Sequence, residues 1–231
     1  MRRAVLCDLD GTLVDTVADL AAALNGLLAE LGYPALSRRR IRRFVGGGAV
    51  GLVSGGLAEV GHAPADEEAR QRLVARFLEL YAAAPAAHSR PFPGVADTLA
   101  ALAADGWRLA VCTNKPQHLA ERILADLDLD RHFGAVVGGD SVPAKKPDAG
   151  HIRTTLDALD VPHQGGVLVG DSRTDRLAAR NAEIPVVLVT YGYTEMPVTG
   201  MGAARVIGSF DTLPAVLDGR NLGVGMVRQW Q

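Results

Sequence analysis

Four short clusters of polar residues hold the side chains of this chain that could do chemistry together. Asp8 and Asp10 flank a single leucine at the end of an N-terminal apolar run. The other three clusters follow later apolar runs: Thr113-Asn114-Lys115, Lys145-Lys146-Pro147 and Gly170-Asp171-Ser172-Arg173-Thr174-Asp175. In an open α/β sheet, ligands bind beyond the carboxyl ends of the strands, so clusters placed there can converge. Gathered carboxylates, a hydroxyl and a lysine would suit a magnesium ion and a phosphate group.

The order and spacing of these clusters resemble those of the haloacid dehalogenase superfamily of phosphohydrolases, over nearly the whole chain. The resemblance implies that Asp8 is the nucleophile that attacks phosphorus and becomes an aspartyl-phosphate. It implies that Asp10 is the acid/base that protonates the leaving group and then activates water. It also implies that Asp171 holds Mg²⁺ together with Asp8 and the backbone carbonyl of Asp10.

The same resemblance assigns the residues that would bind the phosphate. Thr113 and Asn114 match the pair that offers a hydroxyl and a backbone N–H to its oxygens. Lys146 matches the lysine that neutralises the phosphate and the nucleophile, with Lys145 as the alternative. We expect Lys115 to be structural or peripheral. Asp175 suits a contact to a metal-bound water or to the catalytic lysine, or a cap on the helix that follows.

The elements that must position these residues can be predicted from apolar periodicity. A first strand spans Arg3 to Leu9, and residues 16–88 contain only helical patterns. One helix follows Thr16, with Thr16 and Asp19 spaced as a capping box. A short basic helical stretch spans Ser37 to Phe44 and runs into the glycine-rich turn of residues 45–49, and a long helix spans Asp66 to Ala84.

After residue 88, helices and strands alternate along the chain. The predicted helices are Val95–Asp105, Gln117–Leu127, Ala149–Leu159 and Asp175–Ala182, and the predicted strands are Arg108–Cys112, Ala135–Val137, Val167–Val169 and Val186–Val189. This alternation predicts an α/β fold with a doubly wound parallel sheet. We therefore expect a Rossmann-like core of residues 1–15 and 89–231, with residues 16–88 inserted as a helical cap over the carboxyl ends of the strands.

The position of the insert marks the helical-cap subclass, and several segments resemble the phosphoglycolate phosphatase family: residues 8–16, 45–49, 138–140, 170–175 and 190–193. This resemblance implies 2-phosphoglycolate as the substrate, hydrolysed to glycolate and phosphate. Backbone N–H groups at Gly46, Gly47 and Gly48 would approach a small anion closely. Arg43, or Arg42 beside it, would pair with the glycolate carboxylate. The alternative is a plain turn between helices with solvated arginines.

Other functions stay open at this point. A sugar-phosphate or broad-range phosphatase, or a pyrophosphatase, would keep the core residues and differ in the cap. A phosphohexomutase would use the same paired aspartates but protect its aspartyl-phosphate from water. A phosphonate hydrolase needs a cap lysine for a Schiff base, and residues 16–88 contain none. A non-catalytic binding protein on this fold would have lost one of the aspartates, and all four are present.

Composition restricts the partners and the compartment. The 231 residues carry a net charge of −2 and are 48% hydrophobic, typical of a globular protein and without the positive charge that binds nucleic acid. No apolar run reaches the length of a membrane span, and the apolar run after Met1 is too short for a signal peptide. We expect a cytoplasmic monomer or homodimer that acts on a small phosphorylated metabolite. We expect structural roles for Cys7 and Cys112, and a loosely held tail over residues 219–231.

Overall fold

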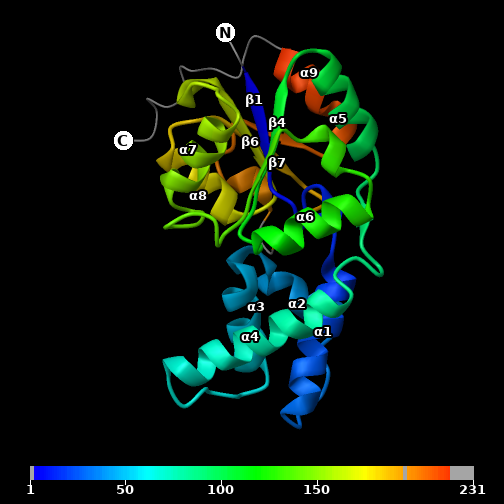
Figure 1. The fold of residues 1–231 in the computed structure, drawn as a ribbon, viewed down its shortest axis with the longest axis vertical. Coiled ribbons are helices and arrows are strands. Elements are labelled where there is room, and N and C mark those ends of the chain that lie inside the picture. The colour runs from blue at the N-terminus through cyan, green and yellow to red at the C-terminus, as the bar shows by residue number, and fades with distance from the viewer. Residues whose placement is uncertain (1–2, 195–196, 219–231) are drawn as a thin grey trace.

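A six-stranded sheet forms the centre of the upper half of the molecule in the computed structural model, which describes residues 3–194 and 197–218 (Figure 1). The strand order is β5–β4–β1–β6–β7–β8, and all neighbouring strands are parallel. The strands are β1 (Ala4–Cys7), β4 (Arg108–Cys112), β5 (Ala135–Val137), β6 (Gly166–Gly170), β7 (Val186–Val189) and β8 (Arg205–Ile207). The predicted doubly wound α/β fold is therefore confirmed. The prediction lacked β8, a three-residue edge strand too short to give a periodic signal.

Apart from the first residues of β4 and β8, both arginines, the strands are apolar because helices cover both faces of the sheet. Along β1, Val5 and Cys7 enter one core cluster while Ala4 and Leu6 enter the other. Helices α5, α6 and α9 contribute to the first cluster and α7 and α8 to the second. Their bounds are α5 (Val95–Ala104), α6 (Gln117–Asp126), α7 (Ala149–Ala158), α8 (Arg173–Asn181) and α9 (Leu213–Asp218). Side chains that alternate between two buried faces explain why these strands read as continuous apolar runs.

Strand β1 lies between β4 and β6, and this placement creates the site. Its last residue, Cys7, pairs in register with Val111 of β4 and Val169 of β6. The loops after these three strands therefore start at the same edge of the sheet. The sheet extends from β1 in both directions, so the order of the strands reverses at β1. Open α/β sheets bind ligands at such a switch point.

The segment between β1 and β4 folds as helices that lie beyond this carboxyl edge, below the sheet in Figure 1. They are α1 (Val17–Glu30), α2 (Arg38–Ile41), the 3₁₀ helix η1 (Arg42–Gly47), α3 (Gly48–Glu59) and α4 (Glu67–Ala83). A two-stranded antiparallel pair, β2 (Val14–Asp15) with β3 (Arg90–Pro91), joins this group to the core. The division into a core of residues 1–15 and 89–231 and a cap of residues 16–88 stays a prediction.

Helix α3 was missing from the prediction, which placed a glycine-rich turn at residues 45–49 and no helix between this turn and the helix that begins at Asp66. Three glycines inside the helix lower its intrinsic helical propensity and interrupt the apolar pattern. Two of them allow close packing instead. A Cβ on Gly55 would lie 2.4 Å from the ring of Phe44, and one on Gly56 would lie 2.8 Å from Leu24.

The predicted capping box at the start of α1 is wrong. Thr16 makes no side-chain cap, and its hydroxyl donates to Oδ1 of Asp10 at 2.6 Å. The carboxylate of Asp19 accepts from the backbone N–H of Ser89 at 2.8 Å and from its hydroxyl at 2.6 Å. Thr16 therefore contacts the turn after β1, and Asp19 contacts the far end of the insert, instead of capping α1.

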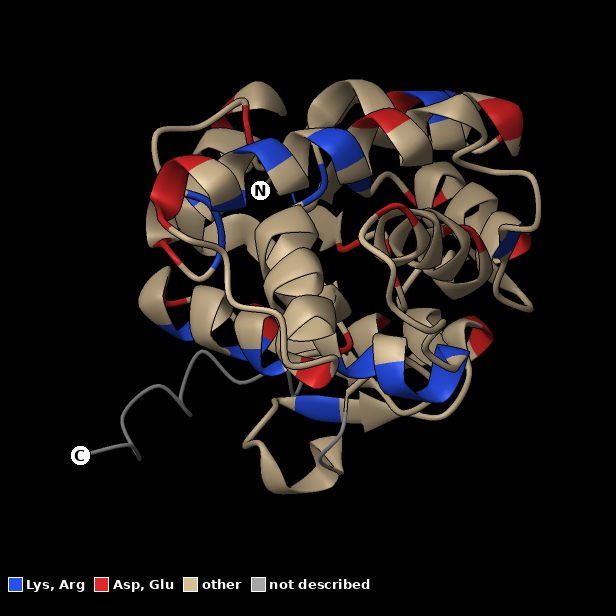
Figure 2. Ribbon diagram, turned by 90° about the horizontal axis from the view of Figure 1, so that it is seen from below, with Lys and Arg blue, Asp and Glu red and all other residues tan. Residues whose placement is uncertain are grey.

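Charged residues of both signs are interspersed over the helices, as the view from below shows (Figure 2). On α4, exposed ion pairs join Arg70 to Glu67 at 2.5 Å and Arg72 to Glu68 at 2.6 Å. Among the helices of residues 3–194 and 197–218, none is long and apolar enough to cross a membrane.

Both cysteines are free and fully buried, on opposite faces of the sheet. Burial raises the pKa of Cys112 to about 11 and that of Cys7 further, so both stay as thiols. Residues 219–231, for which a loose tail is predicted, lie outside the described residues.

Candidate active site

Asp8 and Asp10 lie in the turn that directly follows β1. The backbone N–H of Asp8 donates to the carbonyl of Val169 at 2.9 Å, which continues the strand pairing by one residue. At Gly11 the chain turns with φ +84°, and a Cβ there would lie 2.5 Å from a carboxylate oxygen of Asp171. A glycine is therefore required, because it provides both the left-handed backbone and the room for Asp171.

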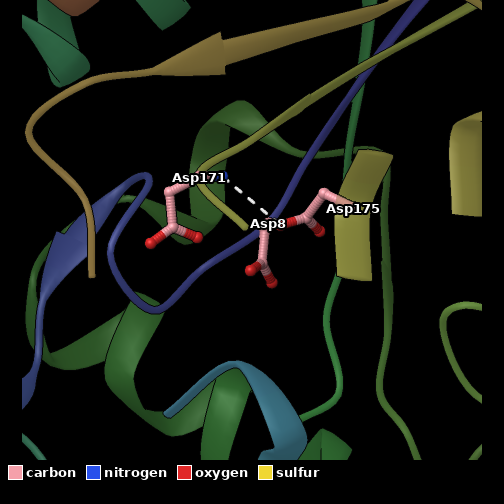
Figure 3. Close-up of side chains that lie close together, drawn as sticks. All are labelled: Asp8, Asp171 and Asp175. Carbon is pink, nitrogen blue, oxygen red and sulfur yellow. Dashed lines mark hydrogen bonds between the residues drawn. The ribbon is translucent and has the colours of Figure 1, made fainter. Parts of the chain in front are cut away.

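Three aspartates converge at the carboxyl edge of the sheet (Figure 3). Asp8 follows β1, Asp171 follows β6, and Asp175 lies on the first turn of α8. One carboxylate oxygen from each lies within 4.8 Å of the others. Burial and the neighbouring carboxylates raise the pKa of Asp8 to about 6 and that of Asp171 well above its ordinary value. Such crowding of buried acids is costly without a cation, so this oxygen-rich group fits a hard divalent metal ion.

Lys146 lies beside this cluster, and its side chain is buried. Its ammonium contacts Oδ1 of Asp175 at 2.7 Å and Oδ1 of Asp8 at 3.0 Å. Burial alone would lower the pKa of Lys146, but the carboxylates of Asp175 and Asp8 more than offset this and hold the pKa above its usual range. The lysine is therefore a permanent cation next to Asp8. The alternative, Lys145, has no such contact among the described residues.

Asp175 takes two of the roles that the sequence left open for it: it caps α8 and it contacts the catalytic lysine candidate. Its Oδ2 accepts from the backbone N–H and the hydroxyl of Ser172, at 3.1 and 2.6 Å, and completes a capping box on α8. Its Oδ1 accepts from Lys146. Since both oxygens already have partners, Asp175 can orient Lys146 and is less suited than Asp8 or Asp171 to bind a metal directly.

Thr113 and Asn114 follow β4 at the same edge. Thr113 is buried, and its hydroxyl oxygen accepts from the backbone N–H of Lys115 at 3.2 Å. The amide of Asn114 donates to the carbonyl of Lys146 at 3.0 Å, while its buried Oδ1 has no hydrogen-bond partner among the described residues. This loop therefore ties the lysine loop to the end of β4.

These residues surround a small cavity, here called the phosphate pocket. It is lined by Asp8, Asp10, Val45, Gly46, Gly48, Thr113, Asn114, Lys115, Lys146, Ser172, Thr174 and Asp175. The core residues predicted for chemistry line this pocket, except Asp171, which lines a neighbouring one. Polar groups from four separate loops thus meet at one edge of the sheet.

The glycine-rich stretch of the helical insert closes one side of the pocket. Gly48 adopts φ +68°, and a Cβ there would lie 3.0 Å from the carbonyl oxygen of Asn114. The carbonyl of Gly46 accepts from the hydroxyl of Thr174 at 3.4 Å. Gly46 and Gly48 line the phosphate pocket, whereas Gly47 lines the neighbouring cavity with Asp171. The backbone of the insert therefore approaches the core closely here, and the substrate contact of Gly46, Gly47 and Gly48 stays a prediction.

The two arginines line a different cavity, together with Asp10 and Asp171. Arg42 donates to the carbonyl of Gly192 at 2.7 Å and lies over the ring of Tyr193 at 5.1 Å. Arg43 lines the cavity that also contains Asp171 and Tyr193, and neither arginine lines the phosphate pocket. The substrate contact predicted for Arg43 stays a prediction.

Of the two alternatives predicted for Lys115, structural or peripheral, the peripheral one is wrong. Lys115 is only 5% exposed, and its ammonium lies 3.0 Å from Oδ1 of Asp10 and 3.0 Å from the hydroxyl of Tyr81 on α4. Burial lowers the pKa of Lys115, but Asp10 and Tyr81 more than offset this, and the pKa lies above its usual range. The contact between Lys115 and Tyr81 joins the core to the insert, so the spacing of residues along the sequence could not predict it. The position of Lys115 directly after Thr113-Asn114 was the one available hint.

Sequence reasoning also missed Tyr193, which follows β7. Its backbone N–H donates to Oδ2 of Asp171 at 2.6 Å. Its phenol donates to Asp15 at 2.6 Å and accepts from the backbone N–H groups of Thr16 and Val17 at 2.6 and 3.0 Å. One residue therefore holds both a metal-binding candidate and the start of the helical insert.

Comparison with known proteins agrees with this geometry. The family model of haloacid dehalogenase-like hydrolases matches residues 5–189. A phosphoglycolate phosphatase of Caulobacter vibrioides is 46% identical over 90% of this chain and 87% of its own length. Another, of Rhodospirillum rubrum, is 43% identical over 92% of this chain and 90% of its own.

Solved structures lead to the same family. A structure described as a predicted phosphoglycolate phosphatase from Haemophilus somnus 129PT has a TM-score of 0.86 at 29% identity, covering 94% of this chain and 98% of that one. CbbY from Rhodobacter sphaeroides, in complex with phosphate, has a TM-score of 0.74 at 29% identity, covering 92% and 96%. This chain belongs to the haloacid dehalogenase-like hydrolase family.

Proposed function

We propose that this chain is a Mg²⁺-dependent phosphomonoester hydrolase whose substrate is 2-phosphoglycolate. The observation that carries the proposal is the buried group of Asp8 and Asp171 with Lys146 beside it. Asp8 and Lys146 line the phosphate pocket, and Asp171 lines the neighbouring cavity. Relatives that match about nine-tenths of the chain are named phosphoglycolate phosphatases, which supports this choice of substrate.

The residues support a two-step phosphoryl transfer. A carboxylate oxygen of Asp8 attacks phosphorus, and the bond to the leaving oxygen breaks with its electron pair on that oxygen. Asp10 gives its proton to this oxygen and releases glycolate. Asp10 then takes a proton from water as the water oxygen attacks phosphorus, which frees phosphate and restores Asp8.

The remaining groups supply positive charge and orientation. Asp8, Asp171 and the backbone carbonyl of Asp10 would hold Mg²⁺, which when bound neutralises charge on the phosphoryl oxygens. Lys146 adds a second cation next to Asp8, in the orientation set by Asp175. Thr113 and Asn114 would donate to phosphoryl oxygens from their place in the phosphate pocket.

The test is the specificity of the purified chain toward small phosphate esters. Initial rates with 2-phosphoglycolate, glycerol phosphates, hexose phosphates and pyrophosphate are compared in Mg²⁺ and in excess chelator. We expect the highest kcat/KM for 2-phosphoglycolate and loss of activity in chelator. A hexose phosphate or pyrophosphate with a tenfold higher kcat/KM would reject the substrate while leaving the chemistry in place. Turnover that depends on a sugar bisphosphate activator would instead indicate a mutase.

A further inference from the structure

We propose that Lys115 binds the carboxylate of the leaving group and so selects the substrate. The proposal rests on the function proposed above and names the residue that would recognise glycolate. It concerns a second cavity, here called the distal pocket, which Asp10 lines but Asp8, Asp171 and Asp175 do not. The distal pocket is lined by Asp10, Leu20, Val45, Gly48, Ala49, Leu52, Phe77, Leu78, Tyr81, Lys115, Pro116 and Leu119.

The distal pocket adjoins the phosphate pocket at the proposed acid/base. Asp10, Lys115, Val45 and Gly48 line both pockets. A phosphate ester held in the phosphate pocket, with its leaving oxygen toward Asp10, can therefore extend its leaving group into the distal pocket. Asp10 also lines the cavity of Arg42 and Arg43, so the chemistry of the two walls decides between these cavities. The distal pocket is a small cavity of about 20 Å³, so it admits only a compact group.

Chemistry also favours a carboxylate in this space. Eight of the twelve lining residues are apolar side chains, and Lys115 is the only cation among the described residues that line it. An apolar wall offers no partners to the hydroxyl groups of a sugar, and burying them unpaired is costly. A single buried cation in such a wall instead matches one anion of small size.

The ammonium of Lys115 retains capacity for a ligand. Lysine has three N–H donors, and in the described part of the chain two have acceptors: Asp10 and the hydroxyl oxygen of Tyr81. Because Tyr81 accepts from Lys115, its own hydrogen remains to be donated. A carboxylate placed between the two would accept one hydrogen bond from each. Since Tyr81 belongs to α4, this recognition would also need the insert to lie against the core.

The arginines are less well placed for the same task. Arg42 is committed to the carbonyl of Gly192 and to the ring of Tyr193. Arg43 lines a cavity that includes Asp171 as well as Asp10, and does not line the distal pocket. Neither arginine lines the distal pocket, and Arg43→Ala tests the competing assignment.

The experiment measures selectivity between two substrates that differ in one group. 2-Phosphoglycolate and 2-hydroxyethyl phosphate share the phosphoryl group and chain length, but only the first has a carboxylate. In Lys115→Met, kcat/KM for 2-phosphoglycolate should fall about 100-fold, because losing one partner of a buried charged contact typically costs several kcal/mol. The value for 2-hydroxyethyl phosphate should fall at least tenfold less than this, because any loss through the contact of Lys115 with Asp10 is common to both substrates. Arg122→Met, which removes an exposed cation from α6, should leave both values unchanged.

A second measurement separates recognition from folding and turnover. Calorimetry with Asp8→Asn as an inert background compares 2-phosphoglycolate binding with and without Lys115→Met, and Tyr81→Phe provides a milder change. Both should weaken binding, the lysine variant more strongly, with folding checked by thermal denaturation. If Lys115→Met does not fold, Tyr81→Phe alone decides: unchanged binding and selectivity in that variant overturn the proposal.

Each further outcome is decisive. If the wild-type chain selects 2-phosphoglycolate and folded Lys115→Met keeps that selectivity, the role of Lys115 is wrong and the proposed function stands. If Arg43→Ala abolishes the selectivity while Lys115→Met does not, the carboxylate is bound by the arginine. If the wild-type chain prefers substrates without a carboxylate, the proposed function and the role of Lys115 both fail.

Discussion

The backbone N–H of Tyr193 donates to Oδ2 of Asp171 at 2.6 Å, and this hydrogen bond orients a carboxylate that would bind the metal. The same tyrosine extends its phenol to the start of α1, where it contacts Asp15, Thr16 and Val17. The proposed metal site and the entry to the helical insert are therefore joined through one side chain. Since a backbone N–H makes the contact to Asp171, the two ends of this connection can be tested separately.

Tyr193→Phe should destabilise the fold while leaving Mg²⁺ affinity nearly unchanged. The change removes the donor to Asp15 and leaves two backbone N–H groups without their acceptor, which typically costs about 1–3 kcal/mol. Urea denaturation and Mg²⁺-dependent activity measure the two effects. Tyr191→Phe is the matched control, because it removes one hydrogen bond, to the carbonyl of Thr12, outside this connection. Equal losses of stability in the two variants would contradict the prediction.

Asp175→Asn should be far more damaging than Ser172→Ala. Both changes disturb the cap of α8, but only the first removes the carboxylate nearest to the buried ammonium of Lys146. Removing one partner of a buried ion pair typically costs about 3–5 kcal/mol, against about 1 kcal/mol for a helix cap. Denaturation curves and kcat check the difference. Similar effects of the two changes would mean that capping is the main role of Asp175.

Stability without metal should depend on pH through Asp8. Its pKa is raised to about 6, mainly by burial, whereas an unfolded aspartate titrates near ~3.9. The contribution of Asp8 to the free energy of unfolding is therefore fully present below pH ~4. As pH rises through about 6 this contribution is lost, and the free energy of unfolding falls by about 3 kcal/mol. In chelator, Asp8→Asn should be more stable than wild type at pH ~8 and close to it at pH ~4. A difference that stays constant over this range would refute the assignment, and saturating Mg²⁺ should recover the loss in wild type alone.

Asp171→Asn and Asp10→Asn should fail in different ways. Asp171 would bind the metal, so its variant should need a much higher Mg²⁺ concentration for half-maximal rate. Asp10 would donate a proton, so its variant should keep the Mg²⁺ requirement and lose about 10²–10⁴ in rate, mostly with poor leaving groups. Mg²⁺ titrations with phosphoglycolate and with an aryl phosphate separate the two. The reverse pattern would mean that the two roles are exchanged.

The local pattern of apolar and polar residues was sufficient to predict much of the fold and the central residues of the site. The strands of the sheet are buried on both faces, so the run before Asp8 and those before Thr113 and Asp171 were visible as short apolar segments. A parallel α/β arrangement brings the carboxyl ends of neighbouring strands together, and this rule was enough to expect convergence. The same reasoning failed where local signals were weak, as in the glycine-containing helix α3 and the short strand β8.

The sequence by itself determined that this chain builds a parallel sheet with acidic loops at one edge and a helical insertion after the first strand. Only the tertiary structure decided which polar side chains meet across those loops. Thr16 and Asp19 have the spacing of a cap, yet they bind Asp10 and Ser89. Lys115 and Tyr81 meet between core and insert, and so do Tyr193 and Thr16. Such pairings depend on how the packed helices and strands lie relative to one another. Hydrophobic burial over the whole molecule sets this arrangement, and the spacing of residues along the chain does not encode it.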